Sequence, residues 1–117
     1  CSAGEGWNLP LVEAMSMGVP VISTDNTAQA EYINIDNSFI IHTNKEEIAN
    51  DGVWFKGDVG SWYPTNVEDV LEDLHKVCQL NESSPHILSK LAHKGQSTIK
   101  DLCNPKHIAK QLLNILT

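Results

Sequence analysis

Two glutamates near the amino-terminal end of the chain have the type and spacing to bind a polar ligand. Glu5 lies in a glycine-rich opening, and Glu13 follows it inside a segment predicted to be helical. A glycine-rich loop that leads into a helix lets backbone N–H groups approach an anionic ligand closely. Carboxylates accept hydrogen bonds from hydroxyl groups. Together these features predict a site for a ligand that carries both phosphate and sugar hydroxyls.

The elements around the two glutamates can be predicted from the residues that begin and end them. We expect a helix capped by Asn8 or Leu9, running to about Met17 and ending at Gly18, a residue type common at helix carboxyl ends. Residues 19–24 are short, β-branched and bounded by turn residues. They are predicted to form a buried strand of a parallel sheet.

The middle of the chain has a weaker pattern. A short helical turn is predicted over residues 29–33 and a second strand over 38–42, and residues 44–66 are predicted to be a long loop. This loop is rich in aromatic residues: Trp54, Phe55, Trp62 and Tyr63. These side chains either stack on a sugar or base, or cover a thin core beneath the loop.

Three amphipathic helices are predicted after Asn66, the second over 85–102 and the third from Asn104-Pro105 onward. Helices that alternate with short buried strands predict an α/β fold. Two strands alone do not make a stable parallel sheet, so we expect the remaining strands in a part of the protein outside this sequence. The start at Cys1, within what reads as a functional loop, favours the same interpretation.

Composition argues against several classes of partner. The formal net charge is −7, and every basic residue is Lys. This disfavours binding to nucleic acid or to an anionic membrane surface, and it leaves no Arg to clamp a phosphate. The sequence contains no apolar run of the roughly 20 residues that a membrane span needs.

The cysteines and histidines give no sign of a metal site. The three cysteines and five histidines are scattered, without the close spacing of a ligand set. We therefore expect no metal and predict reduced thiols, which fits a cytoplasmic protein.

Several segments resemble the retaining glycosyltransferases of the GT-B type (glycosyl transferases group 1, family 4). Residues 4–15 are similar to that family's Glu–x7–Glu motif, and residues 18–22 to the helix exit and strand that follow it. Residues 30–33, 37–39 and 62–68 resemble segments of one subgroup, although the Trp-Tyr-Pro spacing is one residue shorter here. The resemblance implies that residues 1–117 are the C-terminal portion of a Rossmann-like, donor-binding domain. The N-terminal acceptor domain and the start of this domain would then be absent.

The resemblance also implies a reaction and a role for each site residue. Such enzymes, here of hexosyl type, move a sugar from a nucleotide-diphosphate sugar to an acceptor (a glycan, lipid or protein) with retention of anomeric configuration, and they need no metal or other cofactor. Glu5 would be the catalytic carboxylate beside the transferred sugar, and Glu13 would bind the ribose hydroxyls. The remaining donor-binding residues would be Gly6, Trp7, Asn8 and Leu9. The segment alone is expected to be inactive.

Two departures from the family pattern keep an alternative open. The family usually has Gly at the position of Asn8, and Gly-Gly or Ser-Gly at Thr27-Ala28. These changes are compatible with a non-catalytic sugar- or nucleotide-binding domain, or a scaffold domain of the same fold. A Rossmann-type oxidoreductase is disfavoured because the sequence lacks a G-x-G-x-x-G fingerprint. Glu31 fits either a surface charge or a partner of the donor site, and membrane association of the parent protein stays open.

Overall fold

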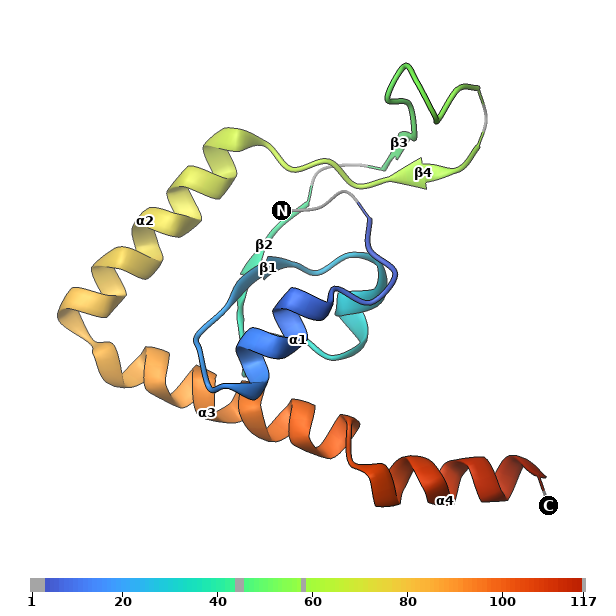
Figure 1. The fold of residues 1–117 in the computed structure, drawn as a ribbon. Coiled ribbons are helices and arrows are strands. Elements are labelled where there is room, and N and C mark those ends of the chain that lie inside the picture. Colours follow the sequence, from blue (N-terminus) through green and yellow to red (C-terminus); the bar gives the residue numbers. More distant parts are fainter. Residues whose placement is uncertain (1–3, 44–45, 58, 117) are drawn as a thin grey trace.

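A small parallel sheet between helices forms the centre of the chain (Figure 1). The computed structural model describes residues 4–43, 46–57 and 59–116. The elements follow in the order α1 (Leu9–Ser16), β1 (Ile22–Thr24), the 3-10 helix η1 (Thr27–Glu31), β2 (Phe39–Ile41), β3 (Glu47–Ile48), β4 (Ser61–Trp62), α2 (Val67–Ser83), α3 (Pro85–Leu102) and α4 (Pro105–Leu116). Strands β1 and β2 are parallel, with Ser23 opposite Ile40. The prediction that residues 19–24 contribute a strand to a parallel sheet is therefore confirmed for Ile22–Thr24, and its partner is the second predicted strand.

The turn from α1 into β1 explains why the strand is shorter than predicted. Gly18 takes a left-handed backbone with φ of 71°, and its N–H donates to Met15 O at 2.9 Å. The N–H of Val19 donates to Ala14 O at 3.0 Å, so it closes the end of the helix. Pro20 has no N–H to give. The prediction of a strand over 19–24 is thus wrong in its first half, and β1 begins only at Ile22.

The segment between the strands also differs in detail from the prediction. The helical turn expected over residues 29–33 is a 3-10 helix that lies earlier, at Thr27–Glu31. It ends there because Gln29 O accepts the N–H groups of both Tyr32 and Ile33, at 3.1 and 3.0 Å. Strand β2 lies inside the predicted range of 38–42, one residue shorter at each end.

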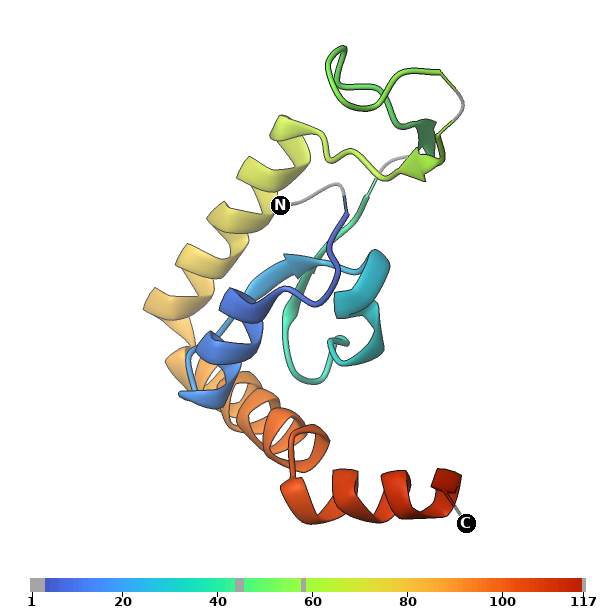
Figure 2. The same ribbon diagram turned by 45° about the vertical axis from the view of Figure 1, so that its right-hand side comes forward.

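The hydrophobic core lies between α1, the sheet and α3. Met15 of α1 is completely buried, and a Cβ built on Gly95 of α3 would lie 3.3 Å from its Cε atom. The two helices therefore meet closely at this point, and Figure 2 shows α1 stacked above α3. The buried members of this cluster are Leu11, Met15, Val21, Tyr32, Ile33 and Ile99.

The three predicted carboxyl-terminal helices are confirmed. Asn66 caps α2 by accepting the Glu68 N–H at 3.2 Å, and a proline occupies the first turn of α3. Helix α2 packs along β2 and α3, yet none of its residues is fully buried. Every residue of α4 is exposed, including its apolar face, and the helix projects away from the rest of the molecule (Figure 1).

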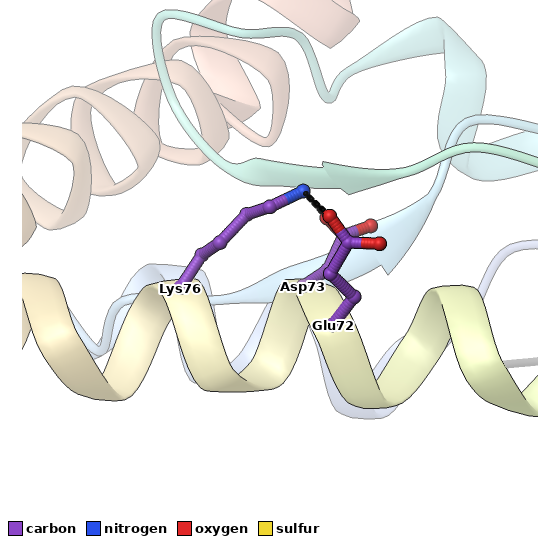
Figure 3. A network of polar contacts seen from close by, with 3 residues as sticks. All are labelled: Glu72, Asp73 and Lys76. Atoms are coloured by element: carbon purple, nitrogen blue, oxygen red, sulfur yellow. Dashed lines mark hydrogen bonds and ion pairs between the residues drawn. The ribbon is translucent and has the colours of Figure 1, made fainter.

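The acidic side of α2 carries a surface ion-pair network. Lys76 Nζ lies 3.0 Å from Glu72 Oε1 and 3.1 Å from Asp73 Oδ1 (Figure 3). Hydrogen bonds to Glu72 and then to Asp73 raise the pKa of Lys76 above its ordinary value. Because the Lys76 and Glu72 side chains are largely exposed, such pairs add little to stability. These charges therefore form a solvated face of α2.

The long loop predicted at 44–66 contains structure that the sequence did not reveal. Strands β3 and β4 pair antiparallel, with Glu47 opposite Trp62, and form a hairpin arm at 46–63. Residues 44, 45 and 58 lie outside the described part. The expectation that the loop aromatics cover a core is wrong for Trp54, which is 85% exposed. Phe55 instead packs edge-on against Trp62, with ring centroids 6.3 Å apart.

The mixed helix and strand content is compatible with an α/β fold, and a Rossmann-like arrangement stays a prediction. Cys78 and Cys103 are free and exposed, while Cys1 lies outside the described residues. Within the described ranges, no three His, Cys, Asp or Glu side chains are placed to share a metal ion. None of the described helices is both long enough and apolar enough to cross a bilayer.

Candidate functional site

The main chain of Glu5 is fixed by the residues that follow β1. Its N–H donates to Thr27 Oγ1 at 2.9 Å, and its carbonyl accepts the Ala28 N–H at 3.4 Å. Both contacts use the backbone of Glu5, so they orient the loop without occupying the carboxylate. Glu5 is half-buried, whereas Glu13 is exposed on α1.

A second support holds the loop two residues later. The hydroxyl of Tyr32 donates to Trp7 O at 2.7 Å, and the two rings pack with centroids 5.3 Å apart. Burial, and then the negative charge of the nearby Glu5, raise the pKa of Tyr32 above its ordinary value. The Tyr32 hydroxyl therefore stays protonated at neutral pH and keeps donating this hydrogen bond.

Buried polar side chains lie beneath the Thr27 turn. Gln29 Nε2 donates to Thr24 Oγ1 and to Asn26 Oδ1, both at 3.1 Å, and Asn26 Nδ2 donates to Tyr63 O at 3.4 Å. These contacts tie the end of β1 to the segment that precedes α2. Gln29 Oε1 is buried and accepts no hydrogen bond within the described residues. Sequence reasoning missed this network, although polar residues directly after a buried strand were a signal for it.

The two departures from the family's glycines fall on left-handed backbone. Asn8 has φ of 60° and Thr27 has φ of 52°. Glycine adopts this conformation at no steric cost, and asparagine tolerates it better than most residues. In addition, Asn8 Oδ1 accepts the Leu11 N–H at 3.3 Å, as expected of a helix cap. The loop thus keeps a backbone conformation suited to glycine while using side chains that add hydrogen bonds.

The loop leaves a run of backbone donors without a protein partner. Among the described residues, the N–H groups of Gly6, Trp7, Asn8 and Leu9 donate to no other group. They lead into α1, whose first residue is Leu9, and the helix dipole favours negative charge at this end. Such a run of donors can donate hydrogen bonds to phosphate oxygens.

Glu5 lines two hollows on the surface. One, of about 410 Å³, is bounded by Asn8 and the start of α1 together with the segment that enters β1. The other, of about 540 Å³, is bounded by Gly6 and by the hairpin arm. Glu13 lines neither hollow in the described part of the chain. The structure therefore brings Glu5, Gly6 and Asn8 together, and it leaves Glu13 on the outer side of the helix.

The hairpin arm is ordered by one carboxylate. Asp51 Oδ1 accepts the N–H groups of Val53, Trp54 and Phe55 at 2.8, 2.8 and 2.9 Å. The bonds from Phe55 and then Val53 are the largest causes that lower the pKa of Asp51. This clamp fixes the backbone that presents Phe55 to Trp62.

Acidification is expected to loosen this turn. A carboxyl whose folded pKa is lowered stabilises the fold above its unfolded pKa, and that contribution is lost as the pH falls through the folded pKa. We expect the amide shifts of Val53–Phe55 to move toward random-coil values as the pH falls from about 6 to about 2, and Asp51→Asn to produce part of this change at neutral pH. Two-dimensional NMR measures both, with Ile99 in the core as reference. A turn that Asp51→Asn leaves unchanged would contradict the clamp.

The cap at Asn8 gives a second prediction. Asn8→Ala loses the cap, worth about 1 kcal/mol, and places an ordinary side chain in left-handed backbone, costing about 1–2 kcal/mol. Asn8→Gly is the matched control, because it costs only a few tenths of a kcal/mol at a helix cap. Hydrogen exchange of the α1 amides should be much faster in the alanine variant than in the glycine variant. Equal exchange in both would show that the left-handed cap contributes nothing.

Comparison with known proteins gave a family match for the amino-terminal part of the chain. Residues 1–55 match the family model described as Glycosyl transferases group 1. The searches of curated proteins and of solved structures gave no match. The matched residues include the Glu5 loop, α1 and both strands of the parallel sheet. The amino-terminal segment of this chain is therefore similar to a glycosyltransferase family, which supports a transferase as the protein to which it belongs.

Proposed function

We propose that this chain is the donor-binding part of a glycosyltransferase that moves a hexosyl group from a nucleotide-diphosphate sugar to an acceptor with retention of anomeric configuration. The observation that carries the proposal is the position of Glu5. Its backbone is fixed by Thr27 and Ala28, and the residue lines two hollows beside loop amides that have no partner among the described residues. This combination of an acceptor and several donors matches a ligand with sugar hydroxyls and a diphosphate.

Each residue has a role that follows from its chemistry. Glu5 accepts hydrogen bonds from hydroxyls of the transferred sugar. The N–H groups of residues 6–9 donate to the diphosphate, which the amino-terminal end of α1 also favours. Glu13, from its outer position on the helix, accepts the two ribose hydroxyls of a nucleotide that extends along α1. A carboxylate with two oxygens suits such a diol.

The reaction breaks the bond between the anomeric carbon and the diphosphate oxygen and forms a bond from that carbon to the acceptor oxygen. The acceptor hydroxyl loses its proton, and the diphosphate leaves with the electron pair. The loop amides stabilise the negative charge that develops on the diphosphate. All basic residues of this sequence are lysines, so it offers no Arg to clamp the diphosphate. We propose that further cations come from residues upstream. As the family resemblance implies, the proposal includes no metal ion.

The exposed apolar surfaces support a larger parent protein. Val67, Leu71 and Leu74 of α2 are 67%, 59% and 41% exposed, and the whole apolar face of α4 is open. We infer that residues 1–117 are the C-terminal portion of a Rossmann-like domain whose other strands and acceptor-binding domain lie elsewhere in the protein. The proposal includes a cytoplasmic location and an acceptor that is a glycan, a lipid or a protein. It leaves membrane association of the parent protein open.

Hydrolysis of nucleotide sugars by the full-length protein tests the function. A panel of donors is offered, and release of nucleoside diphosphate is measured for the unaltered protein, for Glu13→Ala and for the control Glu82→Ala on the exposed face of α2. We expect one donor to be consumed, with its KM raised about 10- to 100-fold by Glu13→Ala, the equivalent of about 1.5–3 kcal/mol for hydrogen bonds to a charged group. The control should behave as the unaltered protein.

The opposite result identifies the alternative. If no donor is hydrolysed but nucleotides or sugars bind by calorimetry, the chain belongs to a non-catalytic binding domain of the same fold. If nothing binds either, a scaffold role replaces the proposed function.

A further inference from the structure

The hairpin arm forms an aromatic wall directly beside Glu5. The hollow of about 540 Å³ is bounded on one side by Glu5 and its neighbouring glycines, and on the other by Phe55, Trp62, Ala49 and Val59. The arm follows the carboxyl end of β2 and reaches away from the sheet (Figure 1). Ligands of open α/β sheets bind at this edge.

The aromatic wall is held in place while remaining open to solvent. Phe55 is 47% exposed and meets Trp62 at an interplanar angle of 65°. Asp51 fixes the backbone of Phe55, and the Ala49 N–H donates to Gly60 O at 2.8 Å, which closes the base of the arm. An apolar surface that is ordered and exposed is available for contact with another molecule.

The lining selects the chemistry of that molecule. An aromatic face attracts the apolar C–H face of a sugar ring, and a carboxylate opposite it accepts hydrogen bonds from the ring hydroxyls. The negative charge of Glu5 disfavours a phosphate in the same hollow. The volume lies within the range of small-molecule sites.

We propose that the hollow between Glu5 and the hairpin arm binds the pyranose ring of a neutral sugar, with Trp62 against its C–H face, Phe55 packed edge-on against Trp62 beside it, and Glu5 on its hydroxyls. The ring is either the transferred sugar of the donor or a sugar of the acceptor, so this assignment rests on the proposed function. The arm supplies a contact that neither the Glu–x7–Glu spacing nor the helix amides provide.

The test compares two tryptophans of the same arm in the full-length protein. Trp62 lines the hollow, whereas Trp54 is 85% exposed and does not line it among the described residues. Saturation-transfer NMR with methyl glycosides of glucose, galactose, mannose and N-acetylglucosamine should show transfer to the ring protons of at least one of them. The transfer should vanish in Trp62→Ala, persist in Trp54→Ala and return in Trp62→Phe, which keeps an aromatic face.

Kinetics then distinguishes the source of the ring. Trp62→Ala is expected to raise one KM about 3- to 10-fold, from the 0.5–1.5 kcal/mol of an aromatic contact. A raised donor KM assigns the hollow to the transferred sugar, and a raised acceptor KM assigns it to the acceptor. If saturation transfer and both KM values are the same in Trp62→Ala as in Trp54→Ala, the proposal is overturned.

The outcome is separable from that of the proposed function. If the protein hydrolyses no nucleotide sugar but binds a methyl glycoside through Trp62, the sugar site is supported and the transferase function is contradicted. If the protein turns over a donor and Trp62→Ala changes neither the NMR nor the kinetics, the transferase function is supported and the sugar site is contradicted.

Discussion

Replacing Glu5 by glutamine in the full-length protein is expected to lower kcat/KM about 10- to 100-fold, because hydrogen bonds to a charged group contribute about 1.5–3 kcal/mol. The substitution preserves the loop, since Thr27 Oγ1 and the Ala28 N–H contact only the backbone of residue 5. What changes is the side chain between the two hollows. Glutamine keeps one acceptor oxygen, but it loses the charge and gains donors that face the sugar hydroxyls.

Steady-state kinetics with the donor found in the hydrolysis panel measures this effect. Glu82→Gln, on the exposed side of α2, is the matched control and should leave kcat/KM unchanged. A loss confined to KM would place Glu5 in ground-state binding, whereas a loss in kcat would show a contact made in the transition state. Full activity of the Glu5→Gln protein would remove the carboxylate from the mechanism.

Local signals in the sequence predicted the elements that carry the site. Pro85 and Pro105 each opened a helix, and Gly18 ended one, because these residues restrict the backbone wherever they occur. The short β-branched run around Val21 predicted a strand of a parallel sheet, and the strand observed lies in its second half. Such features depend on a few neighbouring residues, so one sequence is enough to reveal them.

The error at the start of β1 is local, since the Val19 N–H donates to Ala14 O in the turn that closes α1 at Gly18. The larger errors came from contacts between residues that are distant in the sequence. Glu47 pairs with Trp62 across a long intervening loop. Short-range patterns do not reveal a pairing between residues so far apart, so the hairpin arm was not predicted. Whether Glu5 and Glu13 lie around one hollow depends on how the loop folds back onto Thr27, and spacing alone could not determine that.

The left-handed residues explain how the loop tolerates its departures from the family. A glycine at residue 8 or 27 would satisfy the backbone but could not donate or accept through a side chain. Asn8 instead accepts the Leu11 N–H, and Thr27 accepts that of Glu5. Each residue offsets the strain of positive φ with a hydrogen bond that fixes the loop. The departures are thus compatible with an ordered loop at the proposed sugar-nucleotide site. They do not by themselves favour a non-catalytic domain.

The core beneath α1 is expected to decide whether this loop keeps its shape. Met15 is completely buried against α3, so Met15→Ala should destabilise this region by about 2–5 kcal/mol, through lost burial and the cavity left behind. Met17 lies two positions further on and is 77% exposed. The matched control Met17→Ala should therefore stay within about 0.5 kcal/mol of the unaltered protein.

Hydrogen exchange of the α1 amides in the full-length protein measures the local stability that the two variants change. Faster exchange in Met15→Ala should be accompanied by a higher donor KM, because α1 carries Glu13 and begins directly after the loop amides. The coupling runs through packing, since Met15 lines neither hollow beside Glu5 among the described residues. If exchange in α1 rises strongly while the donor KM stays constant, the amino-terminal end of the helix does not hold the diphosphate, and the loop amides must act without it.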